Sequence, residues 1–323
     1  MAIAALVSGM AFVSMTVLAQ VSVDPALVAY QPVQGVSGSL KSVGSDTMNN
    51  TMTLWAEGFL GMYPNVRIEI EGKGSSTAPP ALITGSSQFG PMSREMKAAE
   101  VDEFESKYGY PPTSLPAAID MLGVYANKDN PVCKSGLTLQ QVDAIYSTNR
   151  LLGYDSNIRT WGEAGVTDKA WSNQPISLYG RNSASGTYGY FKKYVLGNGD
   201  YKPSVKEQPG SSSVVQGVSS DAKGIGYSGI GYLTADVCAI PIAYDGASNP
   251  VPATTEYAYT GEYPLSRFMY VYLNYRPGSE LDPLRREFVR YMFSSDGQED
   301  VIKDGYYPIT NSIAYEAMEA LCF

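Results

Sequence analysis

Residues 180–191 read Gly-Arg-Asn-Ser-Ala-Ser-Gly-Thr-Tyr-Gly-Tyr-Phe. The stretch follows a short apolar strand and is expected to open a helix. Because a helix start leaves backbone N–H groups unpaired and carries partial positive charge, Ser185, Gly186 and Thr187 would direct amides and hydroxyls at one point. Arg181 adds a forked cationic donor. The stretch therefore predicts a site for a tetrahedral oxyanion, the alternative being an ordinary Ser/Thr helix cap beside a surface arginine.

The composition excludes several classes of protein. The chain has 323 residues, enough for two lobes, and a net charge of −9. That charge argues against nucleic acid or an anionic membrane surface as a partner, but not against a small anion held in its own pocket. The sequence contains no histidine, which excludes Ser-His-Asp triads, histidine metal sites and histidine acid–base catalysis. We expect no metal and no cofactor.

The three cysteines, Cys133, Cys238 and Cys322, lie far apart in the chain and form no Cys-x-x-Cys motif. This spacing excludes a zinc knuckle and a thioredoxin-type redox motif. In an oxidising compartment two of the three can pair and leave one free, and the spacing does not favour any of the possible pairs.

The N-terminal segment is typical of an exported protein. Residues 2–19 are apolar and end in small side chains, which predicts a signal peptide over residues 1–19; an N-terminal membrane anchor is the alternative. No cysteine precedes Cys133, so a lipid-anchored form is excluded. We expect a soluble, exported mature protein in which residues 20–38 form an unanchored leader.

From residue 39 onward, strand patterns alternate with helix patterns, as in α/β proteins. Met48, Met52, Trp55, Phe59 and Met62 recur at helical spacing and indicate an amphipathic helix facing a core. Ligands of open α/β sheets bind outside the carboxyl ends of strands. Four predicted strand ends are followed by turns rich in Ser, Thr and Gly, and together they predict one ligand site; the turns are residues 44–47, 74–77, 90–94 and 181–187.

Two matches to nucleotide-binding motifs fail on their context. Residues 224–229 match G-x-G-x-x-G, but residues 230–233 are predicted to be a strand and not the helix that the motif requires. Residues 72–76 contain the Gly-Lys-Gly-Ser-Ser sequence, in which the lysine precedes the second glycine instead of following it. Neither dinucleotide binding nor ATP hydrolysis is expected.

The four turns resemble those of the PstS family, the periplasmic phosphate-binding proteins of the phosphate-specific ABC transporter. The resemblance rests on Gly-Ser-Asp-Thr-Met at 44–48, Gly-Ser-Ser at 74–76, Phe-Gly-Pro-Met-Ser-Arg at 89–94 and Arg-Asn-Ser-Ala-Ser-Gly-Thr at 181–187. These motifs stand in the family's order and approximate spacing. The chain is most similar to the version found in pseudomonads and related Gram-negative bacteria, and the resemblance covers the chain after residue 38.

The resemblance implies an α/β fold of the type II Venus-flytrap class, a two-lobed periplasmic binding protein with two crossover strands. The first lobe would combine residues 39–121 and 268–323, and the second would comprise residues 122–267. The crossover strands would lie near residues 117–125 and 264–272.

The resemblance also implies a function. The protein would bind inorganic phosphate in the interlobe cleft and deliver it to permease subunits of an ABC importer in the inner membrane, as a monomer in the periplasm and without catalysis. The alternatives are a binding protein for another tetrahedral oxyanion, such as sulfate, and a phosphatase on the same scaffold. The absence of histidine and of clustered carboxylates argues against a phosphatase; turnover of a chromogenic phosphate ester would identify one.

By motif match, the resemblance implies that donors from both lobes hold the phosphate. These donors are Thr47, the amide of Met48 and Ser75 in the first lobe, and Arg181, Ser185, Gly186 and Thr187 in the second.

The chain departs from the best-known family member at two positions. That protein has an aspartate at the position of Ser93, which accepts a hydrogen bond from the proton of the phosphate. It also has an aspartate at the position of Ser183, which pairs with the arginine. We expect Asp46 or Arg94 to replace the lost function and assign phosphate selectivity to Asp46; the alternative is that Asp46 only caps a helix.

Overall fold

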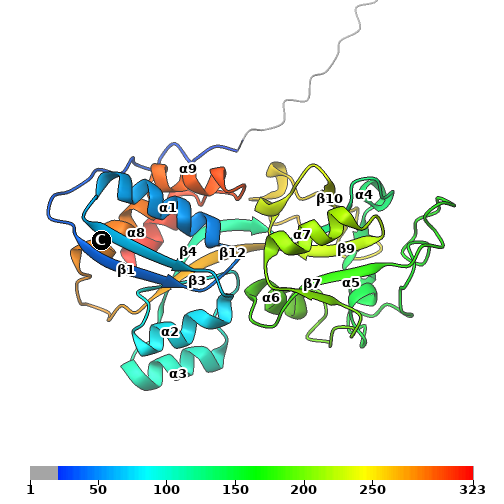
Figure 1. Ribbon diagram of the computed structural model, residues 1–323, viewed down its shortest axis with the longest axis horizontal. Helices are drawn as coiled ribbons and strands as arrows, with labels where there is room; N and C mark the ends of the chain where they lie inside the picture. Colours follow the sequence, from blue (N-terminus) through cyan, green and yellow to red (C-terminus); the bar gives the residue numbers. More distant parts are fainter. Residues whose placement is uncertain (1–20, 323) are drawn as a thin grey trace, which may run out of the picture.

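The computed structural model describes residues 21–322, which form two α/β lobes side by side (Figure 1). The predicted signal peptide lies outside the described residues. Each lobe is built on a five-stranded sheet with helices on both faces. The predicted two-lobed α/β architecture is therefore confirmed.

The sheet of the first lobe has the strand order β2-β1-β3-β12-β4. β1 runs parallel to β2 and β3, whereas β12 runs antiparallel to β3 and β4. The carboxyl ends of β1, β2 and β3 therefore meet at one edge, where β12 begins. The strands are β1 (Gly38–Val43), β2 (Val66–Glu71), β3 (Phe89–Met92), β4 (Thr113–Met121) and β12 (Ser266–Leu273).

Helices cover both faces of this sheet. Met52, Trp55 and Phe59 of the first helix are fully buried, as their spacing predicts. On the opposite face, Phe104 packs in a separate cluster with Tyr272 of β12. One face carries α1 (Asn49–Met62), α8 (Pro283–Met292), α9 (Ser295–Lys303) and α10 (Asn311–Glu319), and the other carries η1 (Ser75–Thr77), α2 (Ala78–Thr84) and α3 (Ala98–Tyr108).

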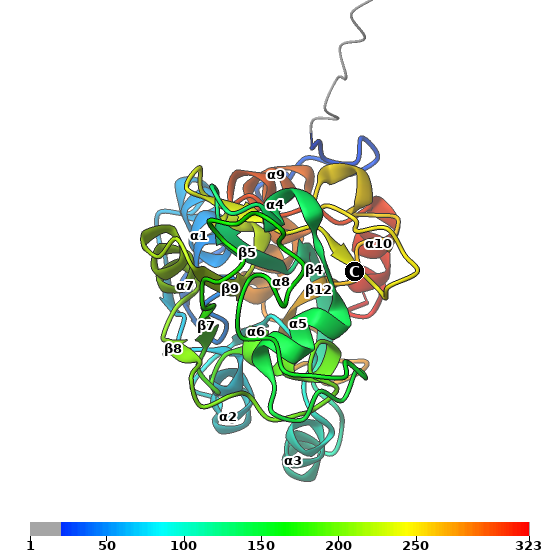
Figure 2. The same cartoon turned by 90° about the vertical axis from the view of Figure 1, so that its right-hand side faces the viewer.

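The sheet of the second lobe has the order β10-β5-β9-β7-β8. Figure 2, which views this lobe end-on, shows α7 and α5 on opposite sides of β5 and β9. The ring of Phe191 in α6 stacks on Tyr227 of β9, with centroids 3.9 Å apart. The main elements are β5 (Gly123–Asn127), α5 (Leu139–Tyr146), β7 (Ser177–Arg181), α6 (Gly186–Tyr194), β8 (Lys206–Gln208), α7 (Ser211–Ser220), β9 (Gly224–Ser228) and β10 (Val237–Ala239). Short elements complete the lobe: α4 (Val132–Ser135), β6 (Leu137–Thr138), η2 (Ile230–Tyr232), β11 (Ile242–Ala243) and η3 (Thr255–Tyr257).

Two adjacent crossings join the lobes. β4 leads through Leu122 directly into β5, and Leu265 leads from the second lobe into β12. The N–H of Leu122 donates to the carbonyl oxygen of Leu265 at 3.0 Å. The two crossing segments therefore lie side by side and form the hinge region between the sheets.

The segment that precedes β1 is packed against the first lobe. Tyr30 is buried, and its hydroxyl donates to Glu287 at 3.0 Å and lies 2.7 Å from the hydroxyl of Tyr63. The prediction of an unanchored leader is therefore wrong for residues 21–38. Leu27 and Val36 are also buried; these scattered apolar side chains have no periodicity that would reveal their packing from sequence.

Residues 224–228 of the glycine-rich motif form strand β9, Gly229 follows it, and residues 230–232 form a 3-10 turn where a strand was predicted. The glycines serve close packing: a Cβ on Gly226 would lie 2.7 Å from a methyl of Val214 in α7. A Cβ on Gly229 would lie 2.5 Å from the Tyr306 hydroxyl of the first lobe. The repeated glycines therefore bring β9 and its following turn close to their neighbours.

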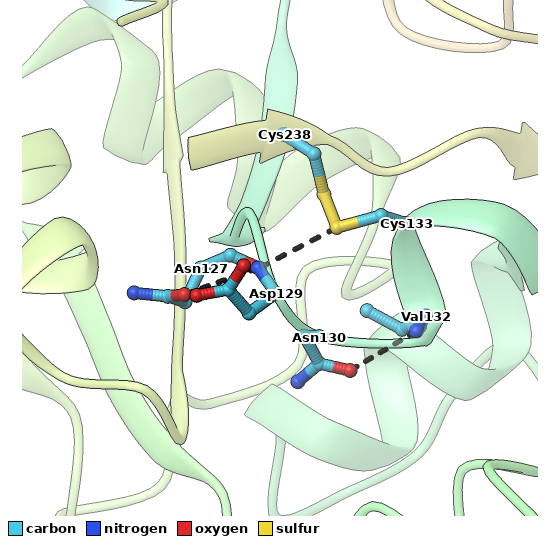
Figure 3. Close-up of a disulfide and its surroundings, with 6 residues drawn as sticks. All are labelled: Asn127, Asp129, Asn130, Val132, Cys133 and Cys238. Carbon is cyan, nitrogen blue, oxygen red and sulfur yellow. Dashed lines mark hydrogen bonds between the residues drawn. A yellow bond between two sulfur atoms is a disulfide. The ribbon is translucent and has the colours of Figure 1, made fainter. Parts of the chain in front are cut away.

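A disulfide joins Cys133 of α4 to Cys238 of β10 (Figure 3). Cys322 is free and exposed. Figure 3 also shows Asn127, the last residue of β5, beside Cys133. The bond ties α4 to the edge of the second sheet and settles the pairing that the sequence left open.

We expect the double variant Cys133→Ser/Cys238→Ser to lose about 2–5 kcal/mol of unfolding free energy, because the bond closes a loop of 105 residues and restricts the unfolded chain. Urea denaturation of the oxidised protein measures the loss, with Cys322→Ser as the control for an unpaired cysteine. An unchanged midpoint in the double variant would contradict this account.

Candidate functional site

Five hydroxyl-bearing side chains from both lobes meet at the junction, and we refer to them as the hydroxyl cluster: Thr47, Ser75, Ser93, Thr187 and Ser211. All five are buried. The Oγ1 atoms of Thr47 and Thr187 lie 2.9 Å apart, and Ser93 Oγ lies 3.4 Å from Thr187 Oγ1. Ser75 Oγ is 3.3 Å from Ser93 Oγ, and Thr47 Oγ1 is 3.5 Å from Ser211 Oγ.

Each member of the cluster follows the carboxyl end of a strand. Thr47, Ser75 and Ser93 follow β1, β2 and β3, whereas Thr187 and Ser211 follow β7 and β8. Parallel strands bring these ends to a shared edge in each sheet, and the lobes face each other across those edges. The arrangement concentrates hydroxyl groups from distant parts of the chain at one buried point.

The start of α6 is pressed against the first lobe. Ser185 caps the helix by accepting a hydrogen bond from the Tyr188 N–H at 3.3 Å. A Cβ at Gly186 would lie only 2.2 Å from Ser75 Oγ, so glycine is needed for this approach. The unpaired N–H groups of the first helical turn therefore lie next to the cluster.

Arg181, at the end of β7, is the cation of the second lobe and is only 1% exposed. Its Nη1 donates to Ser211 Oγ at 2.6 Å, and its Nη2 lies 3.1 Å from Oδ2 of Asp46. Burial lowers the pKa of the Arg181 guanidinium, and the Asp46 carboxylate opposes this shift. Among residues 21–322, Nε of Arg181 has no hydrogen-bond partner, which leaves one buried donor for an anion.

A second buried arginine, Arg267 of β12, belongs to the first lobe. Its Nε and Nη2 donate to Oδ2 of Asp120 in β4 at 2.9 and 2.7 Å. Its Nη1 donates to the carbonyl oxygen of Ser93 at 2.7 Å, and Nη2 also reaches Thr187 Oγ1 at 3.0 Å. The N–H of Ile230 in the second lobe donates to Oδ1 of Asp120 at 2.9 Å. This ion pair therefore contacts both lobes.

Asp46 connects its turn to the second lobe. Oδ2 accepts a hydrogen bond from the N–H of Ser211, the first residue of α7, at 2.8 Å, in addition to its pairing with Arg181. The hydroxyl of Tyr232 donates to the backbone oxygen of Asp46 at 3.1 Å. The residue that caps α1 is Met48, so the alternative that Asp46 caps its own helix is wrong. Its carboxylate instead caps a helix of the opposite lobe.

Known proteins resemble this chain over most of its length. The model of the PBP superfamily domain matches residues 29–296. The phosphate-binding protein PstS of Pseudomonas aeruginosa is 52% identical over 300 residues, which cover 93% of this chain and 92% of that protein. The chain belongs to the PstS family. The phosphate-binding protein PstS of Bacillus subtilis is 28% identical and covers 85% of the chain, which spans 82% of that relative.

The fold agrees with solved structures of this family. A Clostridium perfringens protein, described as a phosphate ABC transporter substrate-binding protein and solved with phosphate bound, superimposes with a TM-score of 0.70. It is 26% identical to this PstS chain and covers 84% of it, and the match spans 100% of that structure. The predicted binding-protein fold is thereby confirmed.

Two residues at this junction, Ser211 of the hydroxyl cluster and Arg267 beside it, were missed from sequence. Ser211 follows β8 in the stretch Gly-Ser-Ser-Ser at 210–213, which has the same chemistry as the four turns. That likeness was a usable signal, although the stretch was predicted only as the start of a helix. Arg267 stands at the beginning of a strand, and only the antiparallel direction of β12 brings that beginning to the site edge.

Arg94 does not face the hydroxyl cluster. Its guanidinium donates to both carboxylate oxygens of Glu100, each at 2.7 Å, and to Ser76 Oγ at 3.3 Å. Glu100 in the first turn of α3 is a bidentate partner of Arg94, and no hydrogen bond within residues 21–322 joins Arg94 to the hydroxyl cluster, so these contacts do not favour Arg94 as the replacement for the lost aspartate. Met48 places a fully buried side chain in the core and directs its N–H toward Ser45 Oγ at 3.4 Å.

Two further observations concern residues 21–322. Within this part of the chain, no three side chains of the Cys, Asp or Glu type are grouped so that they could hold a metal ion. No helix in the same range has the length and apolar character needed to cross a membrane.

We expect Asp120→Asn to lower the unfolding free energy by about 3–5 kcal/mol, because it leaves the buried Arg267 guanidinium without its counter-charge. Urea denaturation measures the loss. Asp236→Asn is the matched control: it breaks the exposed pair with Lys128 and should cost less than about 1 kcal/mol. Equal losses in the two variants would show that the buried pair has no special importance.

Proposed function

We propose that this protein binds inorganic phosphate at the hydroxyl cluster and delivers it to an ABC-type phosphate importer. The relatives named above support this function, and one observation in this chain carries it. Hydroxyl and cationic donors from two lobes converge on one buried point, where Arg181 keeps a buried N–H without a partner. Phosphate bound at this point would be removed from water, and its oxygen atoms would accept these hydrogen bonds in place of water.

The proposed ligand shell draws on both lobes. The first lobe supplies Thr47, the amide of Met48, Ser75 and Ser93, with Arg267 holding Ser93 in place, and the second supplies Arg181, Ser185, Gly186, Thr187 and Ser211. In the described structure the hydroxyl groups of the cluster bond to one another across the lobe boundary. We expect them to exchange these bonds for phosphate oxygens, so that the ligand itself favours the closed arrangement of the lobes.

Selectivity for phosphate is assigned to Asp46. Its Oδ2 bonds to Arg181 and Ser211, whereas no hydrogen bond of Oδ1 is found among residues 21–322. Oδ1 can therefore accept a hydrogen bond from the proton that phosphate carries near neutral pH. Sulfate has no such proton and would face an unfavourable carboxylate. In this arrangement the carboxylate that partners Arg181 comes from the opposite lobe, in place of the family aspartate at the position of Ser183.

The protein is proposed to act as a monomer in the periplasm and to catalyse no reaction. The disulfide between Cys133 and Cys238 supports an oxidising compartment outside the inner membrane. The hydroxyl cluster consists of Ser and Thr side chains, and the two carboxylates near it, Asp46 and Asp120, are both paired with arginine. That pairing leaves no free general base, which supports binding without chemistry.

Arg181→Ala should weaken phosphate binding by roughly 30-fold or more, because the loss of one partner from a buried charged pair costs about 2–5 kcal/mol. Isothermal titration calorimetry on protein freed of phosphate measures the effect. Arg276→Ala, which removes an exposed arginine in the loop after β12, is the control and should bind like the wild type. Near wild-type affinity in Arg181→Ala would remove this residue from the site.

Asp46→Asn should reduce discrimination between phosphate and sulfate, because its amide can donate to either anion while the remaining oxygen still accepts from Ser211. Competition of sulfate against phosphate, measured at equilibrium, gives the ratio of affinities. Asp24→Asn, which changes a carboxylate outside the site, controls for the change in net charge. If the ratio stays at the wild-type value, Asp46 serves only as the partner of Arg181.

A further inference from the structure

A groove of about 690 Å³ runs along one flank of the lobe boundary, next to the hydroxyl cluster. The first lobe lines it with residues 94–97, which precede α3, and with residues 266–268 of β12. The second lobe lines it mainly with α6, including Tyr190 and Lys193. Figure 1 shows α3 and α6 on the same lower side of the molecule. We refer to this feature as the lateral groove.

The lateral groove carries positive charge on a protein whose net charge is −9. Its lining includes four cations, Arg94, Lys97, Lys193 and Arg267, and one acidic residue, Glu95. The two arginines are paired with carboxylates, as described above. Lys97 and Lys193 are exposed and form no salt bridge within residues 21–322. These two lysines lie on opposite lobes and line the same groove, where Glu95 offsets part of their positive charge.

One guanidinium links the groove to the cluster. Arg267 lies over the ring of Tyr190 in the groove, with Cζ 5.0 Å from the ring centroid. Its Nη2 donates to Thr187 Oγ1, and its Nη1 donates to the Ser93 carbonyl oxygen. The same side chain therefore borders the lateral groove on one side and contacts two members of the hydroxyl cluster on the other.

We propose that the lateral groove is the route by which phosphate reaches the cluster, and that Lys97 and Lys193 collect the anion from solution. This inference rests on the proposed function. The overall negative charge of the protein repels phosphate, whereas positive charge in a groove with low-dielectric walls raises the local anion concentration and the association rate. Neither lysine bonds to the cluster, so both act on association and not on the bound state.

The test measures association and dissociation rate constants for inorganic phosphate in the double variant Lys97→Gln/Lys193→Gln. Stopped-flow fluorescence can follow a dye on Leu233→Cys in a Cys322→Ser background. Leu233 is 47% exposed and follows Tyr232, which contacts Asp46 across the lobes. We expect the association rate constant to fall about 3- to 10-fold at low ionic strength, with dissociation unchanged. At about 1 M salt the difference should vanish, because the Debye length falls to about 3 Å.

The matched control is Lys134→Gln/Lys169→Gln, which removes two exposed lysines of the second lobe that do not line the groove. It makes the same change in net charge and should leave the association rate near the wild-type value. The inference is overturned if both double variants slow association equally, or if Lys97→Gln/Lys193→Gln changes only dissociation. Failure of the proposed function is distinct, since the wild type would then show no phosphate-dependent signal.

Discussion

The ion pair between Asp120 and Arg267 is the interaction on which the junction of the lobes depends. The two residues stand directly opposite each other on the crossover strands β4 and β12. A buried pair is stable when its remaining hydrogen-bonding capacity is also satisfied. Here Asp120 accepts from Ile230 of the second lobe, while Arg267 donates to Ser93 and Thr187. The ion pair buried between the two crossing strands thus also positions two hydroxyl-bearing residues of the proposed site, Ser93 and Thr187.

The two buried arginines have different roles. Arg267 uses its three nitrogen atoms on Asp120, Ser93 and Thr187, so it holds other groups in place. Nε of Arg181 has no partner within residues 21–322, so it can donate to an anion without breaking a bond at that atom. Burial is the main cause that lowers the pKa of Arg181, and the nearby Arg267 charge acts in the same direction.

Much of the fold and part of the site could be predicted because the responsible patterns are local. The helical spacing of Met52, Trp55 and Phe59 is contained within one helix, and the Ser-Gly-Thr turn at 185–187 is contained within one strand-to-helix connection. The segment at 21–38 shows the limit of this approach. Its apolar residues are too few to form a periodic pattern, so the sequence does not reveal that it packs against the first lobe. That packing depends on distant partners such as Glu287, which lies 257 residues from Tyr30.

The sequence by itself determined the chemistry of this protein: hydroxyl and arginine donors at strand ends, and no histidine for catalysis. Only the tertiary structure decided which side chains act together. Asp46 meets Ser211 across 165 residues, and Arg267 reaches Asp120 across 147. These pairs depend on strand order, on the antiparallel direction of β12 and on the docking of two lobes. The conformational preferences of neighbouring residues determine each turn and each helix cap. They contain no information about which distant segment will pack against that turn or cap.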